Sequence, residues 1–299
     1  MTNVVIKPFD SNQLEQLAKD QTEIYNQATK DLSDFFPAKV EDVVKRFQRT
    51  EFDPKRMYYA FDGPKMIGYA GLTGRDQKNN LRTVGYPWLL KDTPANIRDQ
   101  LYDAMESQCK SEGTKSIRFF ASERYPDMLK FFKSKNFNVT QEFYILNKQL
   151  AKQDYKLPEG YTFRQLKEDD LSNLENVSKN DPKMKEPFNA SDWKRFMGSS
   201  DYNPDNVVVA EKDGKVVGFY SLFIPKEPDQ TKCYFGGVTV HGEHQAIEQF
   251  LLIELMNRAF NRGKKTLETA FYPDSKRLPP AKEMGFKQVS TNYKLEKML

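Results

Sequence analysis

The chain has 299 residues, with 46 Lys and Arg against 42 Asp and Glu, and 38% of its residues are hydrophobic. This composition supports one large domain or two of ordinary size, and the nearly even charge does not favour nucleic-acid binding. No apolar stretch approaches the roughly 18 residues of a membrane span, and the N-terminus lacks the basic flank and apolar core of a signal peptide. We therefore expect a cytoplasmic protein in which Cys109 and Cys233 are reduced thiols.

The first half of the chain predicts alternating strands and helices. A strand, VVIKPF, comes first, and amphipathic helices follow within 10–28 and 39–48. Two apolar runs, MYYAFD and MIGYAGL, are joined by a short Asp-Gly turn and predict a hairpin. The strand RTVGYPWLL, a long helix ending near Gly113, the buried strand SIRFFA, a short helix and a last strand complete the series.

The second half of the chain repeats this pattern. DGPKMIGYAGL in the first half matches DGKVVGFYSL in the second, and Gly68 corresponds to Gly218, 150 residues later. KSKNF matches KEMGF, and EFYILNK matches TNYKLEK, in the same order. The repeat predicts two α+β domains, 1–152 and 158–299, each with a mixed, mostly antiparallel sheet flanked by helices. AKQDYKLPEG is the expected linker.

The element order, the hairpin and the KEMGF segment at 282–286 resemble the GNAT superfamily, the GCN5-related N-acetyltransferases. The resemblance covers nearly the whole chain twice, so it indicates a tandem GNAT protein. It implies transfer of an acyl group, usually acetyl, from coenzyme A to an amine, with no metal. It also implies that the pantetheine arm enters a gap between two diverging strands. The pyrophosphate would then bind at the start of the long helix, where backbone N–H groups favour an anion.

The resemblance assigns coenzyme-binding positions to both repeats, although the glycines of the family's pyrophosphate loop are absent. In the first repeat Arg98 would pair with phosphate directly, and an ordinary helix with an exposed arginine is the alternative. In the second repeat Glu248 would place a carboxylate against the pyrophosphate, which predicts lost coenzyme binding. The assigned residues are Trp88, Leu89, Leu90, Thr93, Ala95, Asn96, Ile97 and Arg98, and in the second repeat Val238, Thr239, Val240, Gln245 and Ala246.

Catalytic residues are harder to place. The family's general-acid tyrosine falls on Phe132 and Ala281, neither of which can donate a proton. Tyr125 and Tyr272 are substitutes, unless they are ordinary half-buried tyrosines. Glu268, on a predicted strand, is a candidate general base, unless it faces solvent.

Two further clusters stand out. The only two histidines, His241 and His244, flank Glu243; a metal site is conceivable, but a solvated loop is favoured and no metal is predicted. The basic residues of segment 45–56 form either a solvated helix face or the lip of a pocket for an acidic acceptor. They are Lys45, Arg46, Arg49, Lys55 and Arg56.

Three hypotheses follow. The first is an N-acyltransferase that uses acetyl-CoA and a small-molecule or peptide amine, with one active and one degenerate repeat. The second is a non-catalytic protein that binds acyl-CoA, a small molecule or a protein partner. The third, a transferase that uses aminoacyl-tRNA, requires a basic patch and a helical arm that the sequence does not display.

Overall fold

The computed structural model describes residues 4–32, 37–49, 52–76, 79–184, 187, 189–197, 203–224 and 231–299. They form two compact units. Unit 1 contains the chain up to Glu142 together with Asn292–Leu299, and unit 2 contains Phe143–Thr291. None of the helices within these ranges has the length and hydrophobicity that crossing a membrane requires.

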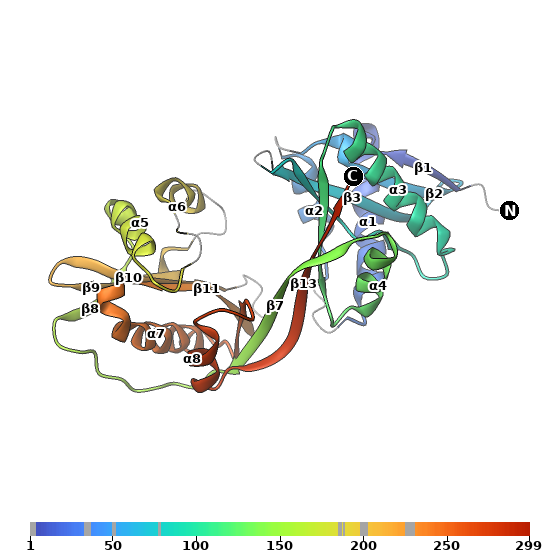
Figure 1. The fold of residues 1–299 in the computed structure, drawn as a ribbon. Helices are drawn as coiled ribbons and strands as arrows, with labels where there is room; N and C mark the ends of the chain where they lie inside the picture. The colour runs from blue at the N-terminus through green and yellow to red at the C-terminus, as the bar shows by residue number, and fades with distance from the viewer. Residues whose placement is uncertain are drawn as a thin grey trace. The chain divides into compact units, whose positions relative to one another are not determined.

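Unit 1 is a mixed sheet between two pairs of helices (Figure 1). Strands β1, β2, β3 and β4 pair antiparallel in sequence order, and β4 then pairs parallel with β6. The short β5 pairs with β3. The elements are β1 (Val4–Pro8), α1 (Leu14–Thr29), α2 (Val40–Phe47), β2 (Met57–Asp62), β3 (Lys65–Asp76), β4 (Leu81–Val84), β5 (Trp88–Leu89), α3 (Asn96–Ser111), β6 (Ser116–Ser122) and α4 (Pro126–Ser134).

Alternation along the strands gives unit 1 a core on each face of its sheet. On β2, Tyr59 packs with the residues of α1 and α2, whereas the next residue, Ala60, packs with those of α3 and α4. Both residues are fully buried. Successive side chains of a strand point to opposite faces, so a sheet covered by helices on both sides buries consecutive residues.

Unit 2 repeats this arrangement. Strands β8, β9, β10 and β11 pair antiparallel, and β11 pairs parallel with β12. Separate cores again lie on the α5–α6 side and on the α7–α8 side. The elements are β8 (Tyr161–Gln165), α5 (Leu171–Lys179), α6 (Ala190–Met197), β9 (Val207–Lys212), β10 (Lys215–Phe223), β11 (Lys232–Val240), the 3₁₀ helix η5 (Gly242–Ile247), α7 (Glu248–Asn261), β12 (Thr266–Phe271) and α8 (Leu278–Glu283).

The predicted repeat is confirmed down to the irregularities of its hairpins. In unit 1 the register of β2 and β3 shifts next to Gly68, and in unit 2 the register of β9 and β10 shifts next to Gly218. A Cβ atom on Gly68 would lie 2.5 Å from Leu89 Cδ2, and one on Gly218 would lie 3.1 Å from Leu251 Cδ1. Both glycines allow a neighbouring element to approach the hairpin closely. The predicted α+β fold, with two tandem units that each contain a mixed sheet flanked by helices, is therefore confirmed.

The units differ from the predicted ranges 1–152 and 158–299 in their last strands, β7 (Asn138–Gln149) and β13 (Lys287–Met298). The end of β7 pairs antiparallel with β12 in unit 2, and the end of β13 pairs antiparallel with β6 in unit 1. Figure 1 shows the red end of β13 running into unit 1 and the green end of β7 running into unit 2. Because the two strands are equivalents in the repeat, their alternation cannot reveal which partner each one takes.

A polar cluster anchors β13 in unit 1. Lys297 Nζ lies 2.6 Å from Glu106 Oε2 on α3, and the buried Tyr102 hydroxyl donates to the same oxygen at 2.6 Å. Burial raises the pKa of Glu106, but hydrogen bonds from Lys110, Lys297 and Tyr102 outweigh it and lower the pKa to about 2. The anchor is therefore an ionised carboxylate over a wide pH range.

Candidate active site

In unit 1 a gap opens where β4 leaves its parallel neighbour. Strand β4 pairs with β6 only from Leu81 to Thr83, and the chain next pairs at β5, with β3 alone. Between these points Gly85 donates to Gly71 O at 2.8 Å, and a Cβ atom on Gly85 would lie 2.9 Å from that oxygen. Pro87 follows in the same irregular segment and has no N–H to offer.

A cavity of about 540 Å³ lies at the start of α3, and we call it the α3 cavity. It brings together five of the eight residues assigned to the coenzyme in this repeat, together with Tyr125. Of the remaining three, Ile97 is buried in the core, and Ala95 and Asn96 are exposed in the first turn of the helix. The five residues are Trp88, Leu89, Leu90, Thr93 and Arg98.

Arg98 is the cation that α3 presents to this cavity. Its guanidinium lies 5.0 Å from the ring centre of Tyr86 and 6.0 Å from that of Phe131. Its Nε is buried and has no hydrogen-bond partner among the described residues. A buried donor without a partner is costly, so this nitrogen is suited to an anionic ligand.

Thr93 does not cap the start of α3. Its hydroxyl donates to Ile67 O at 3.4 Å, and α3 begins after Ala95 with no side-chain cap. Tight turns from Ile97 N to Pro94 O and from Arg98 N to Ala95 O occupy two of the first amides. Fewer free N–H groups therefore face the cavity than in a glycine-rich loop, and Arg98 is the principal positive group at this helix end.

A second cavity, of about 820 Å³, lies on the α1–α2 side of unit 1. We call it the arginine cavity, because Arg46, Arg49 and Arg56 line it. Tyr86 and Trp88 line both cavities, and their rings are in edge-to-face contact with centres 5.1 Å apart. The two cavities therefore share a wall at the point where β4 and β6 diverge. Tyr86 was not among the residues assigned from the sequence.

Tyr125 lies at the N-cap of α4, directly after the buried strand β6, and lines the α3 cavity. Phe132, which takes the position of the family's tyrosine, is fully buried and stacks on Phe119 with ring centres 3.8 Å apart. Of these two positions only Tyr125 can donate a proton into the cavity.

In unit 2 the corresponding gap is filled by the protein itself. Strand β11 pairs with β12 only from Lys232 to Tyr234, so the strands part as they do in unit 1. The loop after α5 then enters, and Asp181 Oδ2 accepts a hydrogen bond from Val240 N at 2.9 Å. The Asp181 side chain is fully buried. The backbone amide expected to pair with pantetheine is therefore already bonded.

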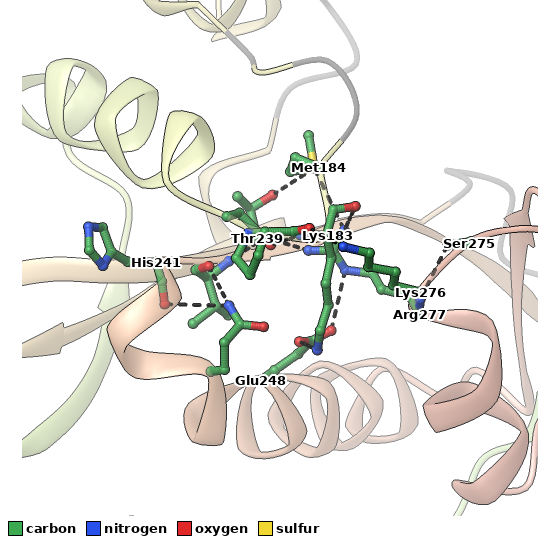
Figure 2. A network of polar contacts seen from close by, with 12 residues as sticks. Lys183, Met184, Thr239, His241, Glu248, Ser275, Lys276 and Arg277 are labelled. Atoms are coloured by element: carbon green, nitrogen blue, oxygen red, sulfur yellow. Dashed lines mark hydrogen bonds and ion pairs between the residues drawn. The ribbon is translucent and has the colours of Figure 1, made fainter.

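Arg277 and Lys183 complete this filling, as Figure 2 shows. Arg277 forms an ion pair with Asp181, and its Nε lies 3.3 Å from Glu248 Oε1. Lys183 forms an ion pair with Glu248, the first residue of α7. The cavity that remains beside these residues has a volume of only about 20 Å³. We call Asp181, Lys183, Glu248 and Arg277 the ionic plug.

The other residues assigned in unit 2 lie around the plug or apart from it. Val238 lines the residual cavity, Thr239 is buried, and Gln245 Nε2 donates to Val240 O at 2.7 Å. Ala246 is exposed in η5, and Tyr272 packs against Phe143.

Thr269 and Phe271 of β12 line the residual cavity, whereas Glu268 alternates with them and forms an ion pair with Lys232 at 3.3 Å. Tyr272 and Glu268 are therefore not among the residues that line it.

The histidine cluster comes together in space. One ligand atom from each of His241, Glu243 and His244 lies within 4.8 Å of the others. His241 Nδ1 accepts from Glu243 N at 3.4 Å as a helix cap, and His244 Nδ1 lies 3.0 Å from the Tyr161 hydroxyl. Burial, with Lys212 and His241 nearby, lowers the pKa of His244. These contacts give both rings a structural role at the start of η5.

The comparisons with known proteins agree with the fold. The model of the Acetyltransferase (GNAT) family matches residues 168–286, within unit 2. Comparison with curated protein sequences gives no significant match. A solved tandem GNAT protein from the clavulanic acid biosynthesis pathway has a TM-score of 0.76 at 13% identity, over 99% of this chain and 98% of that chain.

Two further solved structures share the architecture. A GCN5-related N-acetyltransferase from Sphaerobacter thermophilus has a TM-score of 0.73 at 13% identity, over 99% of this chain and 95% of that one. The N-myristoyltransferase of Saccharomyces cerevisiae has a TM-score of 0.63 at 10% identity, over 99% and 80%. The fold is therefore that of a tandem acyltransferase-like protein. Residues 168–286 match the GNAT family model, and the whole chain shares its fold with the solved tandem GNAT protein.

Proposed function

We propose that unit 1 transfers an acyl group, acetyl in the simplest case, from an acyl-coenzyme A to an amine. The observation that carries this proposal is the wall shared by the α3 cavity and the arginine cavity at Tyr86 and Trp88. A donor in one cavity and an acceptor in the other would meet at this wall. Holding two reactants in contact supplies much of the rate gain in a group transfer.

The α3 cavity fits the coenzyme in size and charge. Its volume of about 540 Å³ lies within the usual range for small-molecule sites. Its lining carries four basic side chains against three carboxylates, and the basic residues include Arg98 with its unpartnered Nε. Arg98 would hold a phosphate of the coenzyme at the helix end, in place of the missing loop glycines.

The residues of unit 1 then have distinct roles. The amine nitrogen bonds to the acyl carbon and loses a proton, while the carbon–sulfur bond breaks and the thiolate gains one. The backbone amide of Tyr86, in the irregular segment between β4 and β5, would polarise the thioester carbonyl, as preorganised donors do for a developing oxyanion. Tyr125 would protonate the departing thiolate from the N-cap of α4.

We assign unit 2 a structural role, because the ionic plug occupies the gap that the coenzyme would need. The acceptor in unit 1 would be a small-molecule or peptide amine, and no step requires a metal. Two buried cysteines, neither of them in a disulfide, fit a reducing compartment, and we infer the cytoplasm. A non-catalytic binding protein is the alternative, favoured by the phenylalanine at the position of the family's tyrosine.

Two variants separate binding from turnover. Arg98→Gln should raise the Kd for acetyl-CoA by about tenfold, because a charge-assisted hydrogen bond is worth roughly 1.5 kcal/mol or more. Tyr125→Phe should leave this Kd unchanged and lower kcat by about 100-fold. The measurements are calorimetric titration and the release of free thiol with a panel of amines.

The matched control is Lys133→Gln, which removes a positive charge from the exposed side of α4. It should change neither quantity. Acetyl-CoA binding without thiol release for any amine would support the non-catalytic alternative. Equal loss of binding in the Arg98 and Lys133 variants would contradict the placement of the coenzyme.

A further inference from the structure

The arginine cavity carries an excess of positive charge. Among the described residues, three guanidinium groups line it against a single carboxylate, Asp53. Arg46 lies in the last turn of α2 and Arg49 just after it, while Arg56 comes immediately before β2. Positive groups therefore reach the cavity from two separate elements.

Asp53 does not neutralise this charge. Its Oδ2 lies 2.9 Å from Arg56 Nε, and its Oδ1 accepts from Lys55 N at 3.1 Å. The carboxylate is thus engaged with Arg56 and its own turn. Neither Arg46 nor Arg49 has an ion-pair partner within the described ranges, so two positive charges remain available to a ligand.

Arg46 acts on the interior of the cavity although its side chain is largely exposed. Burial raises the pKa of Tyr69, which lines the cavity, and the nearby Arg46 charge opposes this rise. The same opposition holds for Tyr59 on the neighbouring strand. The Arg46 charge therefore affects the hydroxyl of Tyr69, which lines the cavity.

The remaining walls are aromatic. Tyr25 meets Trp88 edge to face with ring centres 5.6 Å apart, and Phe52 and Tyr69 also line the cavity. Such walls bury an apolar or aromatic body, and they leave few polar groups to satisfy an uncharged polar ligand. The charged and the apolar parts of the cavity therefore select different parts of one ligand.

We propose that the acceptor is an amine that also carries an anionic group, a carboxylate or a phosphate, at the far end of an apolar body. Guanidinium groups bind both oxyanions through paired N–H donors. The anion would bind Arg46 and Arg49, and the amine would reach the wall formed by Tyr86 and Trp88. This inference rests on the proposed function, since it names the substrate class of the same site.

The test compares three amines of one shape: 4-(2-aminoethyl)benzoate, 4-(2-aminoethyl)phenyl phosphate and the uncharged 2-(4-methylphenyl)ethylamine. With acetyl-CoA as donor, kcat/KM should be at least about tenfold higher for an anionic acceptor than for the uncharged one. A preference for only one of the anions would identify which oxyanion the site takes. Equal kcat/KM for all three amines would overturn the inference and leave the transferase proposal intact.

The double variant Arg46→Gln, Arg49→Gln should remove the preference, because kcat/KM for the two anionic amines should fall to about the value for the uncharged amine. Lys45→Gln is the matched control, because Lys45 is exposed on the same helix and does not line the cavity. A preference that survives the double variant, or that Lys45→Gln removes equally, would contradict the assigned residues.

A binding measurement separates this inference from the proposed function. In a Trp193→Phe background only Trp88 remains to fluoresce, and it lines the cavity. Titration with the three amines, without any coenzyme, should change Trp88 fluorescence at lower concentration for the anionic amines. Charge-selective binding without acyl transfer would overturn the transferase and keep the selectivity for anions.

Discussion

The two units share one fold but differ at the gap in the sheet, which adjoins cavities in unit 1 and is filled by side chains in unit 2. In both, a strand leaves its parallel neighbour after three paired residues, beside the start of a long helix. In unit 1 the gap adjoins cavities of about 540 and 820 Å³, whereas in unit 2 the cavity that the described residues form beside the plug has only about 20 Å³. The difference comes from the loop after α5, which brings Asp181 and Lys183 into the gap, and from Glu248 and Arg277, which pair with them. The divergence of the two parallel strands is therefore retained in unit 2, although the protein's own side chains fill the gap between them.

The comparison also separates sequence similarity from site architecture. The family model matches 168–286, in the unit whose gap is plugged, and the open cavities lie in the other unit. Family similarity follows the pattern of the core and the turns, which both units need. Function depends on which side chains surround the gap.

The largest expected effect comes from breaking the plug. Arg277→Gln leaves the fully buried Asp181 without its cation and leaves Glu248 with Lys183 alone. Removing one partner of a buried ion pair typically costs about 3 kcal/mol or more, so unit 2 should lose that much free energy of unfolding. Denaturant unfolding in a Trp88→Phe background, followed by Trp193 fluorescence, reports on unit 2.

Arg262→Gln is the matched control, because Arg262 and Asp205 form a more exposed ion pair at 3.8 Å. Such pairs contribute about 1 kcal/mol or less. Equal losses in the two variants would show that the plug is not a buried network.

A second test uses the equivalent glycines of the two hairpins. The added methyl group of Gly68→Ala would meet Leu89 Cδ2 at 2.5 Å and Trp88 O at 3.0 Å. In Gly218→Ala the nearest atoms are farther away, at 3.1 and 3.3 Å. We expect losses of about 2 and about 1 kcal/mol respectively, because overpacking grows with overlap. A larger loss for Gly218→Ala, measured by thermal unfolding, would contradict the closer approach in unit 1.

The smallest effect concerns the anchor of β13 in unit 1. Glu106 has a folded pKa of about 2 against an ordinary value of 4.5. Its contribution to stability is therefore present above pH 4.5 and is lost as the pH falls from 4.5 towards 2. Glu106→Gln should cost about 1 kcal/mol at pH 7 and almost nothing near pH 2.

Denaturant unfolding of the wild type and the variant across this pH range measures the difference. Glu15→Gln, on the exposed face of α1, should show no such pH dependence. A constant difference between the wild type and Glu106→Gln from pH 7 to pH 2 would show that Glu106 does not act as an ionised anchor.

Much of the fold could be predicted because the sequence pattern of each element occurs twice, once in each repeat. The hairpins, the long helices and the gap near Pro87 follow from apolar periodicity and from turn residues, which are local signals. The exchange of β7 and β13 could not be predicted, because both strands carry the same alternation and either pairing buries the same faces.

The candidate site was only partly predictable for a similar reason. Arg98 and Glu248 were found because their positions at helix starts are fixed by the sequence pattern. Asp181 and Arg277 are 96 residues apart, and their ion pair depends on a loop path that no local pattern encodes. Tyr86 was missed because an aromatic residue in a buried strand is ordinary, and its importance comes from lying between two cavities.

The central claim is that unit 1, and not unit 2, binds the coenzyme. Hydrogen–deuterium exchange with and without acetyl-CoA tests it directly, because each unit reports through its own amides. The account predicts added protection in 85–98 and 125–128, and none in 238–248. Protection of 238–248 with no change in 85–98 would place the coenzyme in unit 2 and contradict the account.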